Sequence, residues 1–148
     1  MYEHLLVPVD GSALSDKAID HSIGLAKMLG AAITGFTAEP PLPVLVVEQA
    51  AVDYDIETFQ EHEKRCEAHA REVLLAFAEK ARQAGVAFDG QFVITDNVQQ
   101  AIADMAEKRS CDLIVMASHG RHGLDALIHG SLTKSVLAHT RVPLLVLH

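Results

Sequence analysis

The fold of this chain is decided by residues 113–133, which read LIVMASHGRHGLDALIHGSLT. The first four residues are apolar and predict a buried strand. A glycine loop follows and closes on Gly130, after which a helical pattern begins that we expect to start at Ser131. Glycine allows a tight turn, and the N–H groups and macrodipole of a helix start attract phosphate. The stretch therefore predicts an anion-binding loop, which differs from a Walker loop because it lacks Gly-Lys-Ser/Thr.

Apolar runs and helical spacings alternate through the rest of the chain. Besides residues 113–116, they predict strands at residues 5–9, 31–38, 86–95 and 142–147. They predict helices at residues 15–29, 56–84, 97–108 and 131–139. This alternating order defines an α/β fold with a doubly wound, five-stranded parallel sheet, in a single domain over residues 1–148.

Local signals mark the ends of several predicted elements. Ser12 or Ser15 caps the first helix, Gly30 stops it, and Asn97 caps the third helix. The strand at residues 86–95 alternates apolar and polar side chains, which indicates an exposed, edge-like position in the sheet.

The long helix predicted at residues 56–84 is preceded by a different kind of segment. Three prolines within residues 39–52 exclude a regular element there, so this segment is expected to form a loop or lid. Its apolar residues 44–47 are expected to pack on the body of the protein or on a partner. The apolar stripe of the long helix consists of Phe59, Cys66, Ala70, Val73, Leu74, Phe77 and Ala81.

Charge and composition argue against several classes of function. The formal net charge of −8 argues against a nucleic-acid surface, which requires a basic patch. Apolar runs are too short to cross a membrane, and the first residues lack the basic region of a secretion signal, so we expect a cytoplasmic protein. Cys66 and Cys111 are then expected to be buried thiols and not a disulfide.

The last predicted strand suggests an assembly. Residues 144–147 are all apolar, and at a sheet edge they leave unpaired backbone groups beside leucine side chains. A two-fold partner that adds its own last strand removes this exposed edge. We therefore predict a homodimer through the C-terminal strand.

The motifs at both ends of the chain resemble the universal stress protein family. The resemblance extends over essentially the whole length and includes LLVPVDGSALSDKAI, ITGFTA and CDLIVMASHGRHGLDALIHGSLTKSVLAHTRVPLLVL. In the nucleotide-binding branch of that family the loop reads Gly-x-x-Gly, nine residues, and Gly-Ser or Gly-Thr. Here Gly120, nine residues and then Gly130-Ser131 match that pattern. The resemblance implies a Rossmann-like sheet with strand order 3-2-1-4-5.

The resemblance also implies a site for ATP, AMP or another adenylate, with Mg²⁺ as a companion ion of the phosphates. The positions that match the adenine and ribose pocket are Pro8, Val9, Asp10 and Ala38. The positions that match the phosphate cradle are Gly120, Gly130, Ser131, Leu132 and Thr133. All of them lie at the carboxyl ends of predicted strands or just beyond, where open α/β sheets bind ligands.

One position of the loop departs from the family pattern. Ala117 stands where the first glycine of the pair is expected, and its methyl group resists positive φ and lies toward the phosphate space. This departure supports an alternative hypothesis, in which the chain is a dimeric interaction module that binds no nucleotide. Asp10 has two interpretations as well, since it can hold the ribose or cap the turn before the first helix.

Two other constellations favour structural interpretations. His62, Cys66 and His69 share one helix face and include zinc-ligand types, but Cys66 falls within the apolar stripe, which favours a buried thiol. Ser118 and His119 are adjacent and point to opposite sides of a strand, so they do not predict a nucleophile–base pair. The resemblance then implies a regulator of the stress response and not a fast enzyme, with slow ATP hydrolysis as the most that the site would catalyse.

Overall fold

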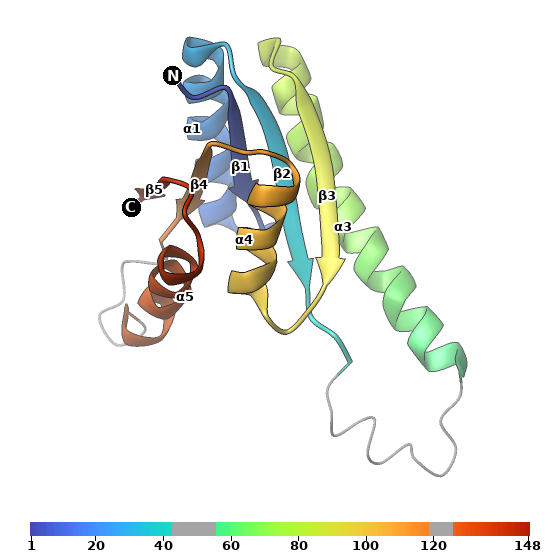
Figure 1. Ribbon diagram of the computed structural model, residues 1–148. Helices are drawn as coiled ribbons and strands as arrows, with labels where there is room; N and C mark the ends of the chain where they lie inside the picture. Colours follow the sequence, from blue (N-terminus) through green and yellow to red (C-terminus); the bar gives the residue numbers. More distant parts are fainter. Residues whose placement is uncertain (43–55, 119–125) are drawn as a thin grey trace.

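The computed structural model describes residues 1–42, 56–118 and 126–148, with residues 56–57 and 126–131 described through their backbone only. Within these residues the chain forms a five-stranded parallel sheet with the order β3-β2-β1-β4-β5 (Figure 1). The strands are β1 (His4–Pro8), β2 (Ala32–Glu39), β3 (Phe88–Ile94), β4 (Leu113–Ala117) and β5 (Leu144–Leu147). The predicted fold and strand order are therefore confirmed, with strand ends that differ by one or two residues.

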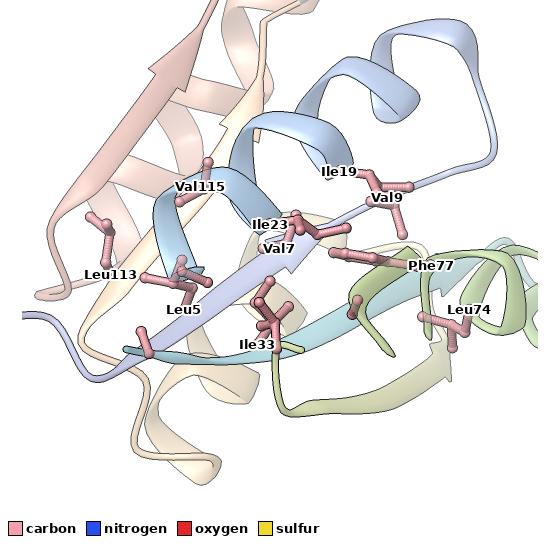
Figure 2. Packing of buried hydrophobic residues seen from close by; sticks show 14 residues of the cluster. Leu5, Val7, Val9, Ile19, Ile23, Ile33, Leu74, Phe77, Leu113 and Val115 are labelled. Atoms are coloured by element: carbon pink, nitrogen blue, oxygen red, sulfur yellow. The ribbon is translucent and has the colours of Figure 1, made fainter. Parts of the chain in front are cut away.

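Helices cover both faces of the sheet. They are α1 (Ala13–Leu29), α3 (Ile56–Ala84), α4 (Val98–Lys108) and α5 (Ala126–His139). One buried cluster joins α1 and α3 to the sheet, and Figure 2 shows Ile19 and Ile23 of α1 and Phe77 of α3 within it. A second buried cluster on the opposite face is formed with α4 and α5 and includes Phe36, Ile102 and Val136. Covering on both faces explains why β1 and β4 are continuous apolar runs.

Helix ends follow the predicted caps. The Ser12 hydroxyl accepts a hydrogen bond from the Ser15 N–H at 3.3 Å, so Ser12 is the N-cap of α1. Gly30 ends α1 in the left-handed conformation at a φ of 68°. Asn97 caps α4 by accepting from the Gln100 N–H at 3.3 Å.

The neighbouring strands β1 and β4 diverge along their length. Within the described residues, β1 pairs with β4 through Leu5 with Leu113 and Leu6 with Ile114, at the amino ends of the strands. In contrast, β1 pairs with β2 along its whole length. The carboxyl ends of β1 and β4 therefore open a crevice at the point where the chain order reverses.

The start of the last helix was predicted wrongly. Helix α5 begins at Ala126, five residues before the predicted start, so Gly130 and Ser131 lie within its second turn. Ala126, Leu127 and Ile128 favour the helix, and a single helical glycine disfavours it by only about 1 kcal/mol relative to alanine. Gly130 therefore lies inside the helix and not at its start.

The apolar stripe of α3 was predicted too long at its beginning. Cys66, Ala70, Leu74, Phe77 and Ala81 are buried, whereas Phe59 is 43% exposed. Figure 1 shows the reason, because the first turns of α3 extend beyond the strands of the described part of the chain. The predicted loop over residues 39–52 falls mostly outside the described residues, and its first residue, Glu39, belongs to β2.

Both edges of the sheet match the predictions. Strand β3 lies at one edge and exposes Phe92 and Ile94, while β5 lies at the other and exposes Leu145.

None of the helices in the described residues is long and apolar enough to cross a membrane. Cys66 and Cys111 are both buried free thiols, as expected.

Candidate functional site

A cavity of about 280 Å³ lies at the carboxyl ends of β1, β2 and β4. Its apolar lining includes Phe36 of β2, Met116 of β4 and Ile102 of α4, three side chains from the buried cluster of this face. Leu132 of α5 contributes to another wall. The cavity thus occupies the crevice where β1 and β4 diverge, which is the usual ligand position in this class of fold.

Asp10 is held tightly at the mouth of this cavity. Its Oδ1 atom accepts from the Ser15 hydroxyl at 2.6 Å and from the Ser12 N–H at 2.9 Å. The Ser15 oxygen in turn accepts from the Asp10 N–H at 2.9 Å. Asp10 therefore shapes the turn before α1 and lines the cavity at once, so the two interpretations of this residue are compatible.

The end of β2 presents a backbone donor and acceptor beside the cavity. The Phe36 carbonyl accepts from the Val9 N–H on the β1 side, and the Glu39 carbonyl accepts from the Thr95 N–H on the β3 side. Because peptide groups alternate between the two neighbours of a parallel strand, those of Ala38 point to the β1 side. Strand β1 has ended before this level, so these groups lie where a ligand with a complementary edge can pair with them.

The cavity brings together most of the residues predicted for the site. The residues that line it from that set are Pro8, Val9, Asp10, Ala38, Ala117, Leu132 and Thr133. Gly120 lies outside the described residues, as do the loop residues Arg121 and His122. Gly130 and Ser131 are described through their backbone only, within α5.

Sequence reasoning missed the remaining wall of the cavity. Val98 and Ile102 of α4 and Leu14 of α1 line it, and Ser15 was considered only as a helix cap. Val98 and Ile102 are four residues apart, which places them on one helix face. That spacing predicts an apolar face, but it does not show which part of the sheet the face covers.

The predicted cluster on α3 proves to be an anchor for the end of β2. Nε2 of His62 lies 2.9 Å from the Pro40 carbonyl and 3.4 Å from Cys66 Sγ, while Nδ1 of His69 donates to Glu39 Oε1 at 2.6 Å. Burial, and next the Glu39 carboxylate, raise the pKa of the Cys66 thiol. In the part of the chain that the structure describes, no group of three or more His, Cys, Asp or Glu side chains is arranged to hold a metal ion.

The Ser118 side chain lies beside His148, a histidine far from it in the sequence. Its Oγ atom lies 2.8 Å from Nδ1 of His148, just beyond the ends of β4 and β5. The backbone N–H of Ser118 also donates to the Leu147 carbonyl at 2.8 Å. These contacts attach the end of β4 to the end of β5, and His119 lies outside the described residues.

Fold and cavity together define a Rossmann-like α/β protein with an open crevice at the switch point of its sheet. A family model described as the universal stress protein family matches residues 1–148, so the chain belongs to the universal stress protein family.

Known proteins of this family are similar to the chain over nearly its whole length. Universal stress protein A homolog 1 of Coxiella burnetii is 28% identical over 136 residues, which cover 92% of this chain and 89% of that protein. A universal stress protein crystallised in complex with cAMP has a TM-score of 0.72 and 22% identity, with 99% and 97% of the two chains covered. One from Archaeoglobus fulgidus in complex with dAMP has a TM-score of 0.68 and 15% identity, with 99% and 98% covered. The likeness to these two structures shows the fold.

Proposed function

We propose that this protein binds ATP or another adenylate and acts as a dimeric, cytoplasmic regulator of the stress response. The observation that carries the proposal is the convergence on one cavity of Asp10, the end of β2 at Ala38, and an apolar lining. Neighbours of the same fold in complex with cAMP and dAMP support adenylates as the ligand class.

The proposed pose assigns one part of the nucleotide to each part of the cavity. The purine ring stacks against Phe36, Ile102 and Met116, and its edge pairs with the peptide groups of Ala38. The ribose hydroxyls donate to the Asp10 carboxylate. The phosphates, with Mg²⁺, extend toward Thr133 of α5.

The corrected start of α5 changes the proposed role of Gly130. Inside the helix, its N–H is no longer one of the free groups at a helix start. Its lack of a side chain still supports a close approach of phosphate to the helix surface. The free N–H groups then belong to the first turn, which begins at Ala126.

Thermal unfolding with and without millimolar Mg-ATP tests the proposal. At a hundredfold excess over the dissociation constant, binding adds about 2.7 kcal/mol of stability, which raises the unfolding midpoint by several degrees. A Gly130→Val variant is expected to lose this shift, because its side chain would occupy the proposed phosphate position. Unchanged ATP binding by Gly130→Val in titration calorimetry would show that the proposed phosphate position is wrong.

The competing function is a dimeric interaction module without a nucleotide. Ala117 favours it, because its side chain lines the cavity where the family's nucleotide-binding branch has glycine. This function predicts no ATP-dependent shift for the natural protein. A shift that appears only in Ala117→Gly would select the interaction module.

The proposed dimer forms through β5. Because the carbonyls of Pro143 and Leu147 accept from β4 and its extension, the peptide groups of Leu144 and Val146 point away from β4 at the sheet edge. Beside this edge lies a groove of about 500 Å³, lined mainly by apolar atoms and including Met28 of α1 and Leu145. A second copy that pairs with the edge would also cover this groove.

A further inference from the structure

We propose that Ser15 is a positioning residue for the ligand, which orients the Asp10 carboxylate toward the two hydroxyls of a ribose. This inference rests on the proposed function and adds to it a source of sugar specificity. It follows from a reciprocal pair of hydrogen bonds at the mouth of the cavity. The Ser15 hydroxyl donates to Asp10 Oδ1 at 2.6 Å, and its oxygen accepts from the Asp10 N–H at 2.9 Å.

The hydroxyl of Ser15 is not needed to cap α1. That role belongs to Ser12, whose oxygen accepts from the Ser15 N–H at 3.3 Å, a bond that involves only the backbone of Ser15. The Ser15 side chain is 7% exposed and lines the cavity with Asp10. Removal of its hydroxyl would therefore leave the cap in place and remove one of the two donors to Asp10 Oδ1.

The two donors on Oδ1 determine what the carboxylate can do. With the Ser15 hydroxyl and the Ser12 N–H on one oxygen, the plane of the carboxylate is fixed relative to β1. A fixed carboxylate binds a pair of adjacent hydroxyls without losing rotational freedom on binding. Charge-assisted hydrogen bonds of this kind are the stronger ones in proteins, so they distinguish a ribose from a sugar that lacks the hydroxyls.

Ser22 provides a matched control on the same helix. It is a fully buried serine of α1 whose hydroxyl, among the described residues, has no hydrogen-bond partner. Ser22→Ala thus removes a buried hydroxyl from α1 without affecting Asp10. Ser15→Thr is the conservative variant, since it retains the hydroxyl.

The experiment measures dissociation constants for Mg-ATP and Mg-2′,3′-dideoxy-ATP by titration calorimetry. The natural protein is expected to bind ATP about 10- to 100-fold more tightly than the dideoxy analogue. In Ser15→Ala the ratio falls to within about threefold of unity, mainly through weaker ATP binding, while Ser22→Ala keeps the natural ratio. Ser15→Thr restores most of it, and adding Ser15→Ala to Asp10→Ala produces no further loss.

The results separate the positioning role of Ser15 from nucleotide binding itself. A natural ratio in Ser15→Ala, with the protein folded by circular dichroism, overturns the positioning role and leaves nucleotide binding intact. Equal binding of both nucleotides by the natural protein overturns it in the same way. Failure of the natural protein to bind either nucleotide instead overturns the proposed function itself.

Discussion

Gly11 shows how a single residue shapes the turn that supports Asp10. Its φ of +82° is a conformation that side chains rarely adopt. A Cβ atom at this position would also lie 3.0 Å from Cγ2 of Val73 and 3.6 Å from Nε2 of His69. Both the backbone conformation and the proximity of α3 therefore require glycine here.

Gly11→Ala is expected to destabilise the protein more than Gly85→Ala. Gly85 also has a positive φ, of 74°, but has open space around it, so its substitution adds strain alone, about 1–2 kcal/mol. The contact with Val73 adds roughly 1 kcal/mol more at Gly11. Urea unfolding of both variants measures the difference, and equal losses would show that α3 gives way at no cost.

Cys111 is a buried thiol whose ionisation opposes folding. Burial raises its pKa to about 11 from an ordinary value near 9.0, against the lowering effects of a hydrogen bond with Thr34 and of Arg109. Because the folded chain holds the proton more tightly, the thiol contributes nothing to the pH dependence below pH 9. Between pH 9 and pH 11 the unfolded chain ionises first, so stability falls.

We expect this group to lower the free energy of unfolding by about 2 to 3 kcal/mol across that interval. Urea unfolding at a series of pH values, under reducing conditions, measures the fall. Cys111→Ala loses packing but also loses this part of the slope, which separates Cys111 from other titrating groups. A variant with the natural slope would contradict the assigned pKa.

The residues of the site differ in how far the sequence could predict them. The position of Asp10 followed from the strand that precedes it, and the cavity places it beside Ala38 and Ala117. The contact between Ser15 and Asp10 could not be predicted, because both serines near the helix start suit a cap. Only the side-chain geometry shows that Ser12 is the cap and that Ser15 contacts the carboxylate.

At the scale of elements, α3 is attached to the carboxyl end of β2. Glu39 is only 7% exposed, and its carboxylate accepts from Nδ1 of His69 at 2.6 Å. Nε2 of the same ring faces Gly11. A histidine of α3 thus pairs with the segment that bears Ala38 and lies beside the turn that follows Asp10.

His69→Ala is expected to destabilise the protein by about 1–2 kcal/mol, because it leaves a buried carboxylate without this donor. The half-exposed position of His69 keeps the loss at the lower end of the range for buried pairs. Glu39→Gln combined with His69→Ala should recover part of the loss. Chemical unfolding of the single and double variants measures this recovery, with His139→Ala on α5 as the exposed-histidine control.

Element types were predictable, but the start of α5 was not. Strand β4 is apolar throughout, and β1 is apolar after His4. Gly30 ends α1 and Asn97 begins α4 with specific cap geometry. In α5 the helix formers from Ala126 outweigh Gly130, a balance of less than about 1 kcal/mol per residue. Local propensity at that scale cannot fix a helix boundary.

At the scale of the whole molecule, the two sheet edges differ in how they can be covered. Strand β3 has α3 packed beside it, whereas β5 borders the groove that contains Met28 and Leu145. The apolar sequence of β5 predicted its exposed leucine. The groove could not be predicted, because it depends on where α1 lies relative to the last strand.

Leu145→Glu is expected to convert a dimer into a monomer, because a carboxylate in this groove would be buried against the partner. Leu75→Glu on α3 is the control, since Leu75 is 61% exposed and α3 packs on β3, at the sheet edge opposite to β5 (Figure 1). Sedimentation velocity over a range of concentrations measures the assembly. A monomeric natural protein, or a dimeric Leu145→Glu variant, would refute assembly through β5.

The pairing of β1 with β4 also determines when the sheet can be completed during synthesis. Asp112 accepts from the backbone N–H groups of Glu3 and His4, a separation of 109 and 108 residues. A nascent chain that has emerged only as far as β3 can assemble β1, β2, α1 and α3, but it lacks the helices that cover Leu6 and Phe36. One face of the unfinished sheet therefore stays open to water and to other chains until α4 and α5 leave the ribosome, which makes this interval the period of greatest aggregation risk.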